Sequence, residues 1–337
     1  MTTTSREAPA GASPEEITAV PVRHPGRWVG VAVLAVLVAM LFNGVVNNDA
    51  YHWDTVGKYV FDQRLTAAAL VTLELTVIAM FVGVLLGVIL AVMRLSPNPI
   101  LSGAAWVYLW VFRGTPVYTQ LVFWGLISVL YPRLGLGIPF GPEFFSFQTQ
   151  NVITFFVAAA IGLALNESAY MAEIVRAGIT SVDTGQNEAA AALGMTRNHI
   201  MRRIVLPQAM RVIIPPTGNE LISMLKTTSL VVAIPLTSEL YSKSREIALA
   251  LFQPVPLLIC ATIWYLAITS VLMVGQYYVE RYYARGSSRA LPPTPLEKLR
   301  MRLRGLRPPP AGGPDAVPGA RGPGGWTGTP GTTEDGR

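Results

Sequence analysis

Charged residues are scarce in this chain, and so are cysteine and histidine. Asp, Glu, Lys and Arg make up 14% of the 337 residues, against about 25% in soluble domains, which argues against a water-soluble globular protein. Cys260 is the single cysteine, and His24, His52 and His199 are scattered. The sequence therefore predicts neither an intrachain disulfide nor a metal site. No G-x-x-x-x-G-K-[ST] loop occurs, which excludes a P-loop ATPase. We expect no cofactor and no catalytic residue.

Long apolar runs are abundant instead. Hydrophobic residues make up 51% of the chain, and a membrane-spanning helix needs about 20 mostly apolar residues. The fold expected is therefore an all-α integral membrane protein with about six transmembrane helices, of which the fifth is the least clearly bounded. The six segments are Trp28–Val46, Leu65–Met93, Ser102–Tyr131, Val152–Leu165, Leu221–Leu236 and Val255–Val279.

The first apolar segment has an alternative interpretation as a cleaved signal peptide. It is longer than the usual apolar core of about 7–15 residues, and no A-x-A cleavage site follows it. We therefore expect an uncleaved transmembrane helix over residues 28–47. Residues 1–27 contain much Thr, Ala, Pro and Glu and are expected to form a disordered tail.

Basic residues favour one orientation in the membrane. The positive-inside rule compares Lys and Arg in the short loops of the two sides. If the N-terminus is inside, most of these residues are cytoplasmic, and both termini are expected in the cytoplasm of a cell (inner or plasma) membrane protein. The outer side then retains Lys58, Arg64, Arg133, Lys243 and Arg245.

The C-terminal region divides into two parts. Residues 284–307 form a basic juxtamembrane segment in which leucines recur at helical spacing. Two interpretations stay open: an amphipathic helix lying on anionic lipid, or a basic stretch that does not dock. Residues 308–337 are rich in Pro and Gly and are expected to be disordered. Because the positive charge lies beside a membrane span, nucleic-acid binding is not indicated.

The segment 187–207, NEAAAALGMTRNHIMRRIVLP, is the most informative part of the chain. Its four consecutive alanines favour a helix whose backbone a partner surface can approach closely, and Glu188 is the acid beside them. Gly194 falls where a helix C-terminus needs positive φ, and Thr196 can cap the next helix. Pro207 is expected to break or kink that helix. The pattern predicts a helix–turn–helix outside the bilayer; the alternative is an amphipathic hairpin without a partner.

Ionisable side chains also lie within the apolar segments, where a charge is costly and usually faces protein or water. Gly114 and Pro116 follow Arg113, so the helix is expected to be broken there, with free carbonyls near the cation. Arg113 either lines a path through the membrane or braces the fold by pairing with Glu74 or Glu173.

Other polar residues have the same two interpretations. Glu173 and Arg176 are three residues apart and can meet on one helix face, where they would orient the loop that follows or be solvated. Lys226 can extend to the membrane interface or lie at the mouth of a path. Glu167 and Thr115 complete the candidates for a path or for bracing.

Glu188, Ala189, Ala190, Gly194, Ile204, Leu206 and Pro207 together fit one pattern: Glu-Ala-Ala, three residues, Gly, nine residues, Ile, one residue, Leu-Pro. This pattern resembles the loop by which permeases of ABC importers contact their ATP-hydrolysing subunits. Further motifs over residues 65–283 resemble the polar amino-acid permeases, the histidine/glutamine/glutamate-type branch. They are Thr72–Thr76, Phe112–Pro116, Glu167–Tyr170, Gly185–Gln186, Leu206–Ala209 and Lys226–Leu230.

The resemblance implies a five-helix type I importer core over residues 65–283, with cytoplasmic coupling helices in a coupling loop at 180–215. Residues 28–47 would then be an added helix. In the family the positions of Arg113 and Glu74 recur whichever amino acid is carried, which favours bracing.

The resemblance also implies partners. They are an ATP-binding ABC subunit, an extracellular or periplasmic solute-binding protein, a second permease subunit in a homo- or heterodimer, and an amino-acid substrate. ATP hydrolysis would take place on the partner chain. Two alternatives stay open: a permease for another small solute, such as a compatible solute or an opine, and a non-transporting membrane sensor or scaffold. The sequence does not identify the amino acid.

Overall fold

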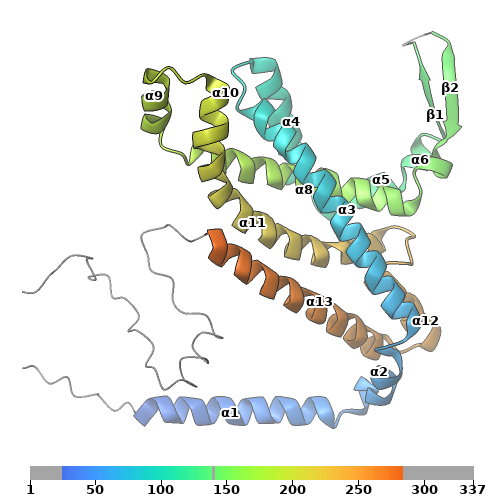
Figure 1. Cartoon of the computed structure of the whole chain (residues 1–337). Helices are drawn as coiled ribbons and strands as arrows, with labels where there is room; N and C mark the ends of the chain where they lie inside the picture. Colours follow the sequence, from blue (N-terminus) through green and yellow to red (C-terminus); the bar gives the residue numbers. More distant parts are fainter. Residues whose placement is uncertain (1–24, 139–140, 284–337) are drawn as a thin grey trace, which may run out of the picture.

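The structure, a computed structural model, describes residues 25–138 and 141–283 and is mostly helical (Figure 1). Within these ranges, four helices are long and apolar enough to cross a membrane. These four confirm the membrane character expected from composition. They are α1 (Pro25–Val46), α3 (Gln63–Arg94), α8 (Phe155–Thr180) and α13 (Pro254–Tyr283).

The count of six spanning helices is not confirmed, because two expected spans are built differently. The third is divided into α4 (Pro99–Gly114), α5 (Val117–Gly125) and α6 (Ile127–Leu130), since Pro116 is extended and ends the helix before it. The fifth belongs to α11 (Leu206–Thr227), which begins earlier than expected and continues as the 3₁₀ turn η3 (Thr228–Ala233).

Shorter elements connect these helices. The tail expected over residues 1–27 is helical from residue 25, and the rest of it lies outside the described residues, as do segments 284–307 and 308–337. The connecting elements are η1 (Asp49–Tyr51), α2 (Trp53–Tyr59), α7 (Thr149–Val152), α9 (Thr184–Ala192), α10 (Arg197–Ile200), the π-helical turn η2 (Met201–Val205) and α12 (Leu240–Leu251).

One β-hairpin departs from the expected all-α fold. Strands β1 (Arg133–Gly137) and β2 (Glu143–Gln148) pair antiparallel, with Leu134 opposite Phe147 and an irregularity after Leu136. Glycine and proline disfavour a helix in this segment, and the three phenylalanines of β2 favour extended backbone. So short a hairpin contains no long apolar run that would mark it in the sequence.

The core of the bundle is the crossing of α3 with α8, where small residues let the two backbones approach. A Cβ atom added at Gly87 would lie 2.5 Å from the Cβ of Met171, and one at Gly83 would lie 2.9 Å from the Cβ of Glu167. Gly83 and Gly87 are four residues apart, the small-xxx-small spacing of tightly packed membrane helices. Leu75, on the same helix, joins a buried apolar cluster that extends to α5 and α11.

We expect Gly87→Leu to destabilise the folded chain, because the added side chain has no room between α3 and α8. Overpacking of this kind costs about 1–3 kcal/mol. Gly103→Leu is the matched control, since a Cβ there meets nothing within 4 Å. The measurement is the temperature at which detergent-purified protein loses its monodisperse chromatographic peak. Equal midpoints for the two variants would contradict the packing argument.

The elements are arranged with two distinct ends (Figure 1). Helices α9 and α10 lie at one end, together with the connection from α3 to α4, while the β-hairpin, α2 and α12 lie away from it. The N-terminal end of α1 and the C-terminal end of α13 point to the same side as α9. Helix α1 stands apart from the bundle and has 0% of its span buried. Its whole apolar circumference is therefore left for lipid or for another chain.

Candidate functional site

The turn between α9 and α10 is built as the sequence predicts. Asp183 caps α9 by accepting a hydrogen bond from the Gly185 amide at 2.7 Å. Gly194 has φ +78, and the Met195 amide reaches back to the Ala190 carbonyl at 3.1 Å. Thr196 caps α10. One glycine in the left-handed region thus fixes the angle at which α9 leaves the bundle.

One alanine of the Glu-Ala-Ala element faces inward and the other side chains face outward. Ala190 is 3% exposed and packs in a cluster with Ile200 and Val205. Glu188 and Ala189 are exposed, and so are Gly194 and Pro207. Ile204 packs partly buried against the same cluster, and Leu206 is exposed. The segment therefore presents a small acidic surface on an anchored helix.

Pro207 does not break the helix, which was one of the two outcomes expected for it. Helical backbone runs without interruption from Arg197 to Thr227, through α10, η2 and α11. Pro207 lies in the first turn of α11, where a missing N–H is tolerated. A π turn precedes Pro207 and is closed by a hydrogen bond from the Leu206 amide to the Met201 carbonyl. This wider turn accommodates the proline without ending the helix.

The break between α4 and α5 does free backbone carbonyls, as expected. The groups that donate hydrogen bonds to these carbonyls are side-chain amides, and not Arg113. Gln120 Nε2 donates to the Phe112 carbonyl at 3.0 Å and to the Thr115 carbonyl at 3.1 Å. It also reaches Thr115 Oγ1 at 2.8 Å. Asn166 Nδ2, from α8, donates to the Phe112 carbonyl at 2.9 Å and to Gln120 Oε1 at 3.2 Å.

Gln120 and Asn166 were not singled out from the sequence. The signal that could have found them is an amide side chain inside an otherwise apolar segment. Together they hold the broken helix against α8, so Thr115 belongs to a bracing network.

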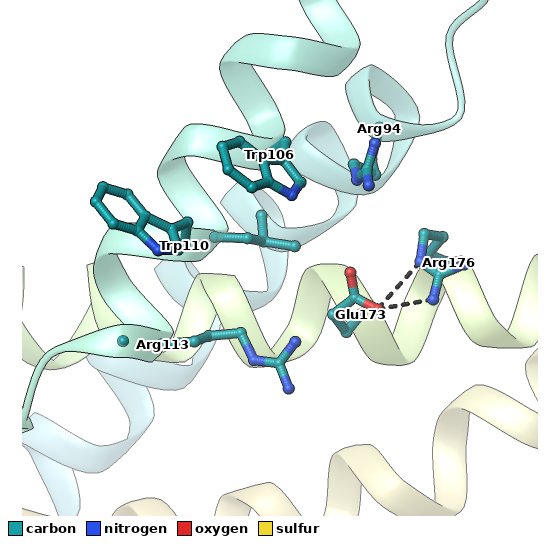
Figure 2. A pocket seen from close by; sticks show the side chains of 8 residues that line it. Arg94, Trp106, Trp110, Arg113, Glu173 and Arg176 are labelled. Carbon is teal, nitrogen blue, oxygen red and sulfur yellow. Dashed lines mark hydrogen bonds and ion pairs between the residues drawn. The ribbon is translucent and has the colours of Figure 1, made fainter.

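A cavity of about 550 Å³ lies beside this break, between α3, α4 and α8 (Figure 2). Arg176 donates to Glu173 at 2.8 and 3.1 Å, which confirms that this pair meets on one helix face. Figure 2 shows this pair and Arg113 pointing into the same space. The cavity is lined by Arg94, Trp106, Leu109, Trp110, Arg113, Gly114, Glu173 and Arg176.

Arg113 does not make the ion pair expected for it. Its guanidinium lies 5.5 Å from the centre of the Tyr170 ring, a cation–π contact. Neither Glu74 nor Glu173 is within ion-pair distance of it in the described part of the chain. Glu74 is exposed on α3 and does not line the cavity.

Polar side chains also gather on α11 and against it. Glu167 is 4% exposed, and its Oε1 has no hydrogen-bond partner among the described residues. Glu220 on α11 is the acid nearest to it in electrostatic terms. Asn219, Ser223 and Lys226 are exposed along one side of α11. Acyl chains of lipid offer no hydrogen-bond partners to these polar side chains, so this stripe is expected to face another protein or water.

The candidate residues therefore fall into separate places. Arg113, Glu173 and Arg176 share the cavity, Glu167 and Lys226 belong to the α8–α11 region, and the Glu-Ala-Ala element lies at the end of the bundle. No group of three or more His, Cys, Asp or Glu suited to a metal occurs within residues 25–138 and 141–283. Cys260 is buried and free in an apolar cluster.

Comparisons with known proteins agree with the resemblance. Residues 83–285 match the family described as binding-protein-dependent transport system inner membrane component. The chain is 56% identical over 289 residues to the arginine transport system permease protein ArgU of Corynebacterium glutamicum, covering 86% of this chain and 90% of that one. It is 37% identical over 213 residues to the nopaline transport system permease protein NocM of Agrobacterium fabrum, covering 62% and 83%.

Solved structures give the same answer. An amino acid ABC transporter crystallised with histidines matches with a TM-score of 0.54 and 35% identity, over 65% of this chain and 94% of that chain. The methionine transporter MetNI matches with a TM-score of 0.52 at 18% identity, over 66% and 98%, which supports the fold alone. The chain belongs to the family of binding-protein-dependent transport system inner membrane components, and within it the chain is a permease subunit of an amino-acid ABC importer.

Proposed function

We propose that this permease carries a cationic amino acid of the arginine type and is driven by a separate ATP-binding subunit that docks on α9, Gly194 and α10. The observation that carries the docking proposal is the anchored helix α9. It exposes Glu188 and Ala189 while Ala190 is packed against the bundle.

The segment is suited to transmit a displacement. Ala190 packs against Ile200 and Val205, and these begin a helical rod that continues to Thr227. A shift of α9 on closure of an ATP-binding subunit would move this rod as one piece. The rod carries the partly buried Glu220 and the exposed Lys226 on α11, so the shift would bias the membrane path between two states.

The substrate proposal is supported by the 56% identical relative named for arginine transport. An opine is the second candidate, because a 37% identical relative is named for nopaline transport. A second permease subunit is supported by the polar stripe of α11 and by the uncovered helix α1. The hairpin and α12 lie away from α9 (Figure 1) and are the surfaces for a solute-binding protein. We place the end with α9 and both termini in the cytoplasm.

The first experiment identifies the partners and the substrate. The tagged chain is purified gently from native membranes, its companions are identified by mass spectrometry, and the complex is reconstituted in vesicles with its solute-binding protein. We expect an ATP-binding subunit, and ATP-dependent uptake of labelled arginine that excess unlabelled arginine suppresses and excess glutamate does not. A complex without an ATPase would refute the docking proposal and favour the sensor or scaffold. Uptake of another solute with no uptake of arginine would refute the substrate proposal.

Reversing the charge of Glu188 should uncouple the transporter. In Glu188→Lys we expect both uptake and substrate-stimulated ATP hydrolysis to fall about tenfold, because a reversed charge at a docking surface costs at least about 1.4 kcal/mol. Asp54→Lys is the matched control, since Asp54 is an exposed acid on α2, away from α9. Undiminished uptake by the Glu188 variant at normal membrane levels would count against the docking surface.

A further inference from the structure

The cavity between α3, α4 and α8 carries more positive charge than its own acid neutralises. Among the residues that line it, Arg94, Arg113 and Arg176 face the single acid Glu173. Glu173 is already engaged by Arg176 at 2.8 Å. No carboxylate of the described residues lies within 4.0 Å of Arg94 or Arg113. Two guanidinium groups are therefore left without an ion-pair partner among the described residues.

The other known contacts of these two arginines leave most of their donors free. Arg94 Nη1 donates to Ser102 Oγ at 3.1 Å, and Arg113 lies over the ring of Tyr170. A guanidinium has five N–H donors in a planar fork that matches phosphate oxygens. A phosphate group held between Arg94 and Arg113 would accept charge-assisted hydrogen bonds from both.

Two tryptophans form the apolar wall of the same cavity. Trp106 and Trp110 are one turn apart on α4, and their rings stack with centres 6.3 Å apart and planes 5° apart. They are 52% and 66% exposed, and Arg113 follows them on the same helix face (Figure 2). Exposed tryptophans beside a cation are typical of the membrane interface, where one side contacts acyl chains and the other contacts headgroups.

The position of the cavity also suits a lipid headgroup. Arg94 is the last residue of α3, and Arg176 lies four residues before the end of α8. Both helix ends are on the side of the bundle that carries α9 (Figure 1). The cavity thus begins at one membrane boundary and extends inward to Arg113. Basic cavities between transmembrane helices at such a boundary are suited to anionic headgroups.

We propose that this cavity binds the phosphate of an anionic phospholipid, with the headgroup between Arg94 and Arg113 and the acyl chains along Trp106 and Trp110. The cavity lining has two more positive than negative residues, so a cationic substrate would be repelled from it. The lipid site is therefore independent of the proposed substrate path, and it is tested by binding rather than by transport.

The test is native mass spectrometry of the delipidated, detergent-purified complex, titrated separately with phosphatidylglycerol, phosphatidylcholine and glycerol 3-phosphate. We expect saturable retention of phosphatidylglycerol at least about tenfold tighter than that of phosphatidylcholine, because both lipids carry the phosphate but the choline cation is repelled by the excess positive charge of the cavity lining. Equal retention of the two lipids would overturn the proposal. So would binding of glycerol 3-phosphate as tight as that of phosphatidylglycerol, since the ligand would then be a free anion.

Substitutions of the two arginines test whether phosphatidylglycerol binds in this cavity. Arg94→Gln and Arg113→Gln should each weaken phosphatidylglycerol retention about tenfold, whereas Arg211→Gln, an exposed arginine of α11 that does not line the cavity, should not. Unchanged retention in both cavity variants would overturn the site. If a glutamine variant does not accumulate, the alternative measurement is quenching of tryptophan fluorescence by brominated lipid. Brominated phosphatidylglycerol should quench a fraction of the fluorescence that brominated phosphatidylcholine does not quench, and Trp106→Phe should remove that fraction. An equal loss with both lipids would overturn the proposal.

Discussion

Uptake should be nearly abolished when Gly194 is replaced by valine, and largely retained when it is replaced by asparagine. Gly194 has φ +78, a conformation that a β-branched residue adopts only at considerable cost and that asparagine tolerates. The strain in valine, about 1–2 kcal/mol, is relieved if the turn changes and α9 leaves its present angle. The two side chains are similar in size, so the comparison isolates backbone conformation from bulk.

The Gly194 effect should appear in coupling and not in folding. Nothing lies within 4 Å of a Cβ at this position, so neither variant creates a clash inside the chain. We expect equal membrane levels, with ATPase docking and substrate-stimulated hydrolysis lost in the valine variant. The measurements are uptake in reconstituted vesicles and co-purification of the ATP-binding subunit. If valine and asparagine behaved alike, the left-handed turn would not be what positions α9.

Features that depend on a few neighbouring residues could be predicted from the sequence. The turn at Gly194 and the capping by Thr196 follow from local backbone chemistry, and both are present. The pair of Glu173 and Arg176 follows from helical spacing alone and is also present. The long helices α3, α8 and α13 follow from runs of apolar residues.

Features that depend on distant parts of the chain could not be predicted in the same way. The break after Arg113 was expected, but the Phe112 carbonyl that it frees also accepts a hydrogen bond from Asn166, which is 54 residues away. Arg113 contacts Tyr170 and not an acid, since its partner is set by how α4 lies on α8. The continuation of helix through Pro207 depends on the π turn, for which apolar periodicity gives no signal.

Glu239→Ala should cause the largest loss of stability among substitutions outside the long helices. Glu239 is 0% exposed and joins three elements. It caps α12 by accepting from the Ser242 amide at 3.0 Å, it accepts from Thr72 Oγ1 of α3 at 3.2 Å, and Tyr265 of α13 donates to it. Truncation removes the cap and leaves buried donors unsatisfied, which together cost about 2–4 kcal/mol.

The matched control is Glu246→Ala on the same helix. Glu246 is an exposed acid whose pair with Lys243, at 2.6 Å, lies on the surface. Pairs of this kind contribute about 0–1 kcal/mol. We expect the thermal midpoint of the purified protein to fall clearly in the Glu239 variant and little in the Glu246 variant. A similar fall in both would mean that the three-element contact contributes no more than a surface pair.

Glu239 should also make stability depend on pH. Burial raises the pKa of its carboxyl, and hydrogen bonds from Tyr265, Ser242 and Thr72 offset this only in part. The folded state therefore holds the proton more tightly than the unfolded state. Below the ordinary glutamate pKa of about 4.3 the carboxyl is protonated in both states, and its contribution to the free energy of unfolding is fully present. As pH rises, the unfolded state loses its proton first and stability decreases until the folded state also ionises.

Glu239→Gln removes this titration while keeping the shape of the neutral side chain. Between pH 5 and pH 8 we expect the thermal midpoint of the wild-type chain to fall relative to that of the glutamine variant, with the two approaching each other at the acidic end. Because every other titratable group is common to both proteins, the difference between their pH profiles reports Glu239 alone. A difference that does not change across this range would show that the buried carboxyl does not titrate there in either state.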